Sequence, residues 1–140
     1  MIKIIFNITF CIFIISSPLF AKNQYFQEGK DFFKNKKFEE AKFKFEQEIV
    51  INPKSELSYL YLSKIFKKFD KIDLQEENLN TVILINPGNE EATFYLAKLK
   101  FESSDYKKSK ELNDRLNSFC NKYCSESQKL KAEIENLSKK

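Results

Sequence analysis

The chain has 140 residues, which is enough for one domain, and its low Gly (2) and Pro (3) counts favour long helices over a turn-rich β fold. A composition of 42% hydrophobic and 31% charged residues excludes a disordered chain. The formal net charge is only +4, and lysines alternate with glutamates as on a solvated helix surface, so we expect no nucleic-acid partner.

Residues 1–21 have the pattern of a secretory signal peptide. Lys3 precedes an apolar run from Ile4 to Ile15, and Ala21 offers a cleavage site. The run is shorter than the roughly 20 residues that a membrane-spanning helix needs. We therefore expect an exported, periplasmic protein. Leu19 stands where cleavage prefers a smaller residue, so an uncleaved inner-membrane anchor over residues 4–20 is the alternative.

The rest of the chain shows apolar periodicity that predicts helices in pairs. The first pair covers 23–34 and 38–51 and is stopped by Asn52-Pro53. The second covers 55–69 and 72–85 and is stopped by Asn86-Pro87, and 87 − 53 = 34. This period is typical of stacked helix-turn-helix repeats. A third pair follows over 89–101 and 106–119, and a last helix over 127–138 has the single apolar stripe of a terminal capping helix.

These residues resemble the tetratricopeptide repeat (TPR) family, whose repeat places small residues at positions 8 and 20, aromatics at 4, 11 and 24, and Pro at 32. With position 1 at Lys22, the first repeat matches at Tyr25, Gly29, Phe32, Ala41, Phe45 and Pro53. Later repeats begin at Glu56 and Glu90. The resemblance implies an all-α fold. It predicts three helix-turn-helix repeats, at 22–53, 56–87 and 90–121, stacked as a short right-handed solenoid with a C-terminal capping helix at 123–140.

In this family the first helix of every repeat lines a concave groove, with positions 2, 5, 9 and 12 pointing inward. Position 9 is a lysine in all three repeats. The resemblance thus implies a peptide-binding groove that contains Lys30, Lys64, Lys98, Phe26, Phe94, Phe33, Lys67 and Phe101. Lysines flanked by aromatics suit an extended peptide with carboxylates. The alternative is that the lysines are solvated surface and the phenylalanines belong to the core.

Two cysteines, Cys120 and Cys124, lie beyond the predicted signal peptide. In an oxidising compartment such a pair favours a disulfide, and a spacing of four residues on a helix brings the Cα atoms to about 6 Å. Free thiols are the alternative. A loop this short predicts a stabilisation of only about 1–2 kcal/mol, so we expect the bridge to fix the angle between the third repeat and the capping helix. Two candidate ligands disfavour a zinc site.

Catalytic motifs are missing from the sequence: it has no histidine, phosphate loop or nucleophile motif. We therefore expect no enzymatic activity, no cofactor and no metal. The expected function is a non-catalytic protein-interaction scaffold in the periplasm that binds an extended or acidic peptide in the concave groove. The alternative is an N-terminally membrane-anchored structural subunit of a larger envelope assembly. Three repeats are near the minimum for a stable array, so a homodimer is also considered.

Overall fold

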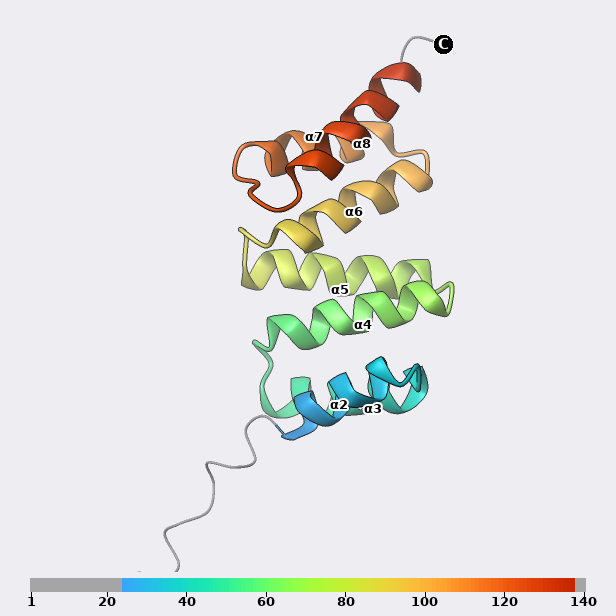
Figure 1. The fold of residues 1–140 in the computed structure, drawn as a ribbon, viewed down its shortest axis with the longest axis vertical. Coiled ribbons are helices and arrows are strands. Elements are labelled where there is room, and N and C mark those ends of the chain that lie inside the picture. The colour runs from blue at the N-terminus through green and yellow to red at the C-terminus, as the bar shows by residue number, and fades with distance from the viewer. Residues whose placement is uncertain (1–23, 138–140) are drawn as a thin grey trace, which may run out of the picture. The chain divides into compact units, whose positions relative to one another are not determined.

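The computed structural model describes residues 24–137, and within this range it contains seven helices and no strand (Figure 1). They are α2 (Gln24–Lys34), α3 (Phe38–Ile51), α4 (Glu56–Lys68), α5 (Ile72–Ile85), α6 (Glu90–Glu102), α7 (Tyr106–Asn117) and α8 (Cys124–Leu137). The predicted all-α repeat fold is confirmed. The predicted signal peptide lies outside the described residues. Among those described, no helix has the length and apolarity needed to span a membrane.

The chain divides into two compact units, and each is described by itself. Unit 1 extends to Pro53 and contains the helix pair α2–α3, whereas unit 2 begins at Lys54 and contains α4 to α8. The bounds predicted for α3 and α5 are those observed. Helix α7 ends two residues earlier than predicted, at Asn117. Helix α8 begins three residues earlier, at Cys124, because the Tyr123 carbonyl already accepts the N–H of Ser127 (2.9 Å).

Each first helix ends in the same left-handed turn. Lys36, Asp70 and Ser104 have φ angles of 59°, 54° and 64°, and they are 34 residues apart (70 − 36 and 104 − 70). The N–H that follows each of them donates to the carbonyl five residues back, at 2.9, 2.9 and 2.8 Å, which is the closure expected at a helix C-terminus. The period read from the sequence therefore continues through the third helix pair.

The core of unit 1 forms where α2 crosses α3. Ala41 and Phe45 on α3 are fully buried, and the Phe45 ring lies over Gly29 of α2. A Cβ atom at Gly29 would come within 2.8 Å of that ring, so the glycine is what allows the two helices to approach. Phe26 packs against Phe45, with ring centroids 5.8 Å apart.

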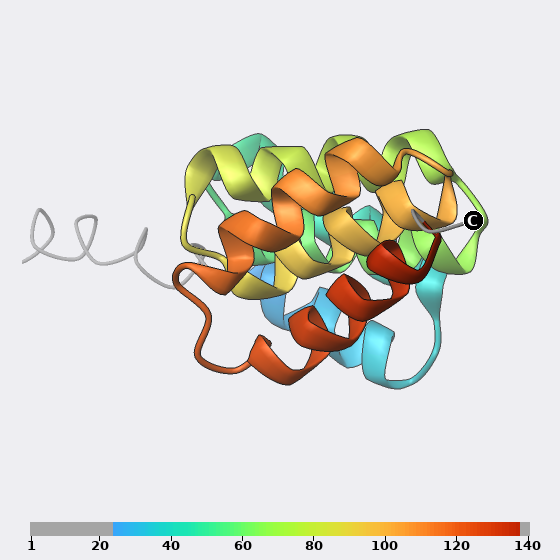
Figure 2. The ribbon, with the colours of Figure 1, turned by 90° about the horizontal axis from the view of Figure 1, so that it is seen from above.

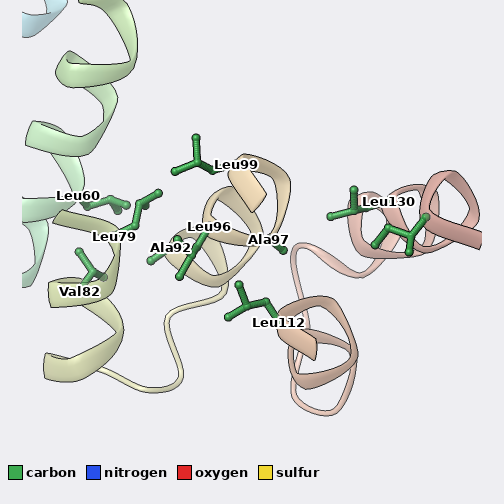
Figure 3. Packing of buried hydrophobic residues seen from close by; sticks show 10 residues of the cluster. Leu60, Leu79, Val82, Ala92, Leu96, Ala97, Leu99, Leu112 and Leu130 are labelled. Atoms are coloured by element: carbon green, nitrogen blue, oxygen red, sulfur yellow. The ribbon is translucent and has the colours of Figure 1, made fainter. Parts of the chain in front are cut away.

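In unit 2 the core is centred on α6 (Figure 3). Leu96 and Ala92 of α6 face Leu79 and Val82 of α5, while Leu112 of α7 and Leu130 of α8 lie on the other side. Ser109 of α7 is fully buried and donates its hydroxyl to the Ala97 carbonyl (2.8 Å), as a close α6–α7 crossing requires. This packing holds α4, α6 and α8 in a fixed relation, which positions the surfaces described next.

Candidate functional site

The first helices of unit 2 carry a band of lysines and tyrosines that we call the α4–α6 face. It consists of Tyr61, Lys64 and Lys67 on α4 and of Glu91, Tyr95 and Lys98 on α6. Residues three and four apart share one side of a helix, so each trio forms a stripe. Two contacts join the stripes: Lys64 Nζ lies 2.6 Å from Glu91 Oε1, and Lys67 Nζ lies 5.9 Å from the centre of the Tyr95 ring.

The charges on this face are unevenly compensated. The side chains of Lys64 and Glu91 are 31% and 28% exposed, and their ion pair neutralises both. Lys67 is exposed and meets an aromatic ring. Lys98 is exposed and lies 4.0 Å from Glu102 on its own helix, a geometry that stabilises little in water. The face therefore offers a net positive surface with tyrosine rings between the charges.

Unit 1 contains the other predicted lysine. Lys30 is half-buried, with Nζ 5.6 Å from the centre of the Phe26 ring, and Phe33 packs edge-on against Phe38 (5.5 Å). Lys30 thus has the same lysine-on-aromatic setting as Lys64, whose Nζ lies 5.2 Å from the centre of the Tyr61 ring. A groove shared by Lys30, Lys64 and Lys98 stays a prediction.

The predicted aromatics of unit 2 are partly core residues. Phe94 and Phe101 are half-buried and pack against the hydrophobic cluster. The Phe94 ring contacts the rings of Tyr95 (5.5 Å) and Tyr123 (5.4 Å), and Phe101 packs edge-on against Tyr106 (5.6 Å). These rings position α6, and only part of each can meet a ligand.

Glu90 and Tyr123 hold the α7–α8 loop against α6, and the sequence did not predict this role for either residue. The Glu90 carboxylate accepts the backbone N–H groups of Lys122 (2.7 Å) and Tyr123 (2.9 Å) in the α7–α8 loop, and hydrogen bonds from this loop lower the pKa of Glu90. Burial against Phe94 and Tyr95 raises the pKa of Tyr123 to about 12. Both residues tie the loop to the first turns of α6.

The sequence does contain one indication of the role of Glu90, which is that a glutamate, Glu56, stands at the same position one repeat earlier. Glu56, the first residue of α4, accepts the side-chain amides of Asn86 (3.0 Å) and Asn89 in the linker that closes its own repeat. Since 90 − 56 = 34, a carboxylate at position 1 fixes the following linker in both repeats. The sequence shows the 34-residue spacing of the two glutamates, but only the structure shows which groups they bind.

Helix α8 is fixed to α7 at its N-terminal end. Figure 2 shows the α7–α8 loop at the same end of unit 2 as the α5–α6 loop, and the Arg115 guanidinium donates to the Pro87 carbonyl there (2.8 Å). Cys120 and Cys124 form a disulfide across this loop, with Cα atoms 5.3 Å apart.

One helical turn further along, two buried polar residues join α7 and α8. The Ser127 hydroxyl donates to Asn113 Oδ1 (2.7 Å), and Asn113 Nδ2 donates to the Ser127 carbonyl (3.0 Å). Both residues are at most 1% exposed, so these bonds satisfy groups that water cannot reach.

Metal chemistry finds no support in the described part of the chain, where no three His, Cys, Asp or Glu side chains cluster as metal ligands would. The side chains of the α4–α6 face are of kinds that suit recognition: ammonium groups can pair with carboxylates, and aromatic rings can pack against apolar side chains.

Comparison with solved structures identifies the fold. The TPR2B domain of yeast Sti1, solved in a complex with pHsp70, matches with a TM-score of 0.75 and 16% identity over 83% of this chain and 97% of that domain. The Yersinia enterocolitica type III secretion chaperone SycD, solved in a complex with a peptide of the translocator YopD, matches with a TM-score of 0.75 and 16% identity. The match covers 90% of this chain and 98% of that chain. The first TPR domain of Spaghetti (RPAP3), bound to the HSP90 peptide SRMEEVD, matches with a TM-score of 0.71 and 15% identity. The match covers 86% of this chain and 98% of that chain.

These likenesses show that the chain has the tetratricopeptide-repeat fold. No protein-family model matches the sequence, and no curated protein matches it either.

Proposed function

We propose that the chain is a non-catalytic protein-interaction module that binds an extended, acidic segment of a partner protein. The observation that carries this proposal is the α4–α6 face, on which three lysines and two tyrosines lie together. Proteins of the same fold bind peptides: SycD holds a YopD peptide, and the peptide bound to RPAP3 is rich in acidic residues. Within unit 1, Lys30 likewise lies over an aromatic ring, that of Phe26.

The contacts on the face indicate how a carboxylate would bind. Lys67 and Lys98 are exposed and can each donate a charge-assisted hydrogen bond. Lys64 is engaged by Glu91 at 2.6 Å, so an incoming carboxylate must displace or share that partner. The rings of Tyr61 and Tyr95, over which Lys64 and Lys67 lie, would pack against the apolar parts of the peptide beside these lysines. Affinity should therefore fall as salt rises, because exposed charges are screened.

Charge reversal tests the proposal. Lys30, Lys64 and Lys98 are changed together to Glu, and partners are recovered from periplasmic extract and identified by mass spectrometry. A control variant changes three exposed lysines outside the predicted groove, Lys71, Lys107 and Lys131, to Glu, which gives the same net charge. We expect the first variant to lose partners that the control keeps. Unchanged partners in both variants would refute an acidic ligand.

A second variant changes binding in the opposite direction. Glu91→Gln removes the carboxylate that neutralises Lys64 and keeps a side chain of similar size. If acidic segments bind at Lys64, the affinity of a recovered partner peptide should rise several-fold at low salt, and the gain should disappear at high salt. An affinity that falls or stays constant would place the ligand elsewhere.

Export to the periplasm is the location we propose, and it rests on residues 1–21 of the sequence. N-terminal sequencing of the native protein tests it. A chain that begins at Lys22 supports the exported binding module, whereas an intact Met1 supports the membrane-anchored subunit.

A further inference from the structure

The disulfide loop between α7 and α8 places the ring of Tyr123 against α6. The loop is closed by Cys120 and Cys124, which are only four positions apart, and Tyr123 directly precedes Cys124. The Tyr123 ring packs against Phe94 (5.4 Å between ring centroids) and edge-on against Tyr95 (6.4 Å). Because so short a cross-link restricts the backbone it encloses, the bridge limits the positions that the Tyr123 ring can take.

Tyr123 is in turn coupled to the α4–α6 face. Its ring contacts Tyr95, over whose ring Lys67 lies (5.9 Å from Nζ to the ring centre). Burial, the Glu91 carboxylate and a hydrogen bond with Tyr95 together raise the pKa of Tyr123 to about 12. Glu91 is also the ion-pair partner of Lys64 (2.6 Å). Tyr123 therefore borders both of the contacts that join α4 to α6 on this face.

The loop lies at the surface of unit 2. Cys120 and Cys124 are half-buried, and their neighbours Asn121, Lys122 and Ser125 are exposed. A thiol reagent or a protein thiol can therefore approach the bridge without unfolding the core, which is the access that thiol–disulfide exchange requires.

Helix α8 keeps its own attachment when the bridge opens. The Ser127–Asn113 hydrogen bonds that join it to α7 are buried, and Leu130 and Ile134 belong to the core cluster. In the loop, by contrast, the bridge acts together with backbone hydrogen bonds to Glu90, one of which is exposed. Opening the bridge therefore loosens the loop and leaves α8 packed.

We propose that the Cys120–Cys124 disulfide is a redox switch for the α4–α6 face: the oxidised loop holds Tyr123 against Tyr95 and favours ligand binding, and reduction by a dithiol weakens binding. This inference rests on the proposed function and adds its regulation. The physical reason is preorganisation. When the loop is closed, the Tyr95 ring is already supported, so less side-chain freedom is lost on binding than when the loop is open.

The reaction is a thiol–disulfide exchange, and the reductant is a small dithiol or a protein with two reactive cysteines. One thiolate of the dithiol attacks a sulfur of the bridge, which forms a mixed disulfide and releases the other cysteine as a thiolate. The second thiolate of the reductant then displaces the remaining cysteine. Two electrons and two protons pass to the Cys120–Cys124 pair, and the dithiol becomes a disulfide.

The test needs a ligand for the oxidised chain. The probe is a peptide enriched from a random library that is displayed on phage and selected against the oxidised full chain. The peptide is labelled, and its dissociation constant is measured by fluorescence anisotropy. The change of Lys30, Lys64 and Lys98 together to Glu shows whether the peptide depends on the lysines of the proposed function.

Reduction with dithiothreitol should raise the dissociation constant of this peptide about fivefold, a modest change because the constraint of so short a loop is small. Changing Cys120 and Cys124 together to Ser gives the matched control. This variant should bind as weakly as the reduced chain and should not respond to dithiothreitol. It keeps Cys11, so it also detects any effect of the reductant elsewhere in the chain.

Two measurements follow the route through Tyr123. Tyr123→Ala in the oxidised chain should weaken binding by a similar factor, and reduction of this variant should add little, because both changes remove the same support. Without any ligand, the pKa of Tyr123 should fall from about 12 toward its ordinary value of 10.0 in the variant with both cysteines changed to Ser. Tyrosinate absorbance from about pH 9 to about pH 11, with Tyr123→Phe as the reference, measures this shift.

The outcomes separate the two proposals. If the oxidised and reduced chains bind the peptide equally while the change of Lys30, Lys64 and Lys98 to Glu abolishes binding, the proposed function stands and the switch is refuted. A raised pKa of Tyr123 that persists without the bridge also refutes the switch, since the ring would then be held by other contacts. If no peptide is enriched, or if the triple lysine change leaves binding unaltered, both proposals are refuted.

Discussion

Gly29 allows α2 and α3 to pack closely, and Gly29→Ala measures how tightly. An added Cβ would lie 2.8 Å from Phe45 Cε1 and 3.0 Å from two more ring atoms. Carbon atoms prefer about 3.5–4.0 Å, so the ring must move by several tenths of an ångström. Phe45 is fully buried and has little room to do so.

Two opposing terms set the magnitude of this effect. Overpacking of a core by a methyl group costs about 1–3 kcal/mol. Replacing Gly by Ala inside a helix contributes about 1 kcal/mol of stability in return. The net expectation is that Gly29→Ala lowers the free energy of unfolding of unit 1 by about 1 kcal/mol.

Native-state amide hydrogen exchange in α2 and α3 is the assay, because it reports the stability of this helix pair separately. In a Phe45→Leu background the ring is gone, so Gly29→Ala should become neutral or stabilising, with a coupling of about 1–2 kcal/mol between the sites. Gly88→Ala is the control, since a Cβ there meets only Asn86 Oδ1 at an ordinary 3.5 Å. Slower exchange in Gly29→Ala itself would refute the close-packing argument.

Three further predictions concern the region where α8 packs against the rest of unit 2. Reducing the Cys120–Cys124 disulfide should lower the free energy of unfolding, measured in urea titrations, by about 1–2 kcal/mol. The amides of α4 and α5 should stay protected from hydrogen exchange, and faster exchange throughout unit 2 would contradict a local role of the bridge. The pKa of Glu90 lies below its ordinary value of 4.5, so its contribution to stability is present above that value and is lost as pH falls below it. Glu90→Gln should therefore flatten the acid side of a stability-versus-pH curve, and an unchanged curve would show that the loop contacts do not depend on the charge. Asn113→Ala removes the side-chain donor to the buried Ser127 carbonyl and leaves the Ser127 hydroxyl only the long contact to the Asn113 backbone carbonyl (3.5 Å). It should destabilise unit 2 by about 1–3 kcal/mol, seen as earlier loss of α8 helicity on heating; no change would mean that water replaces the lost bonds.

The lysines of the α4–α6 face illustrate how far sequence reasoning reaches. The 34-residue period placed Lys64 and Lys98 at equivalent positions on the first helices, and the structure shows that the period persists through the third turn at Ser104. The sequence did not reveal that Glu91 neutralises Lys64, because that ion pair depends on how α6 is rotated against α4. Three of the four predicted aromatics, Phe26, Phe94 and Phe101, also proved to be packed against the core of their own unit.

The sequence by itself determined the elements of this protein: apolar periodicity, Asn-Pro stops and small residues such as Gly29 and Ala41 specify paired helices and their order. These are local signals set on a 34-residue period: the Asn-Pro stop occurs twice, and the left-handed turn occurs in all three helix pairs, so one register places them. Only the tertiary structure decided which charges are neutralised and how Glu90 holds the α7–α8 loop. Those contacts join residues 27 and 32 positions apart in the chain (91 − 64 and 122 − 90), and their distances depend on helix packing angles that no local pattern encodes.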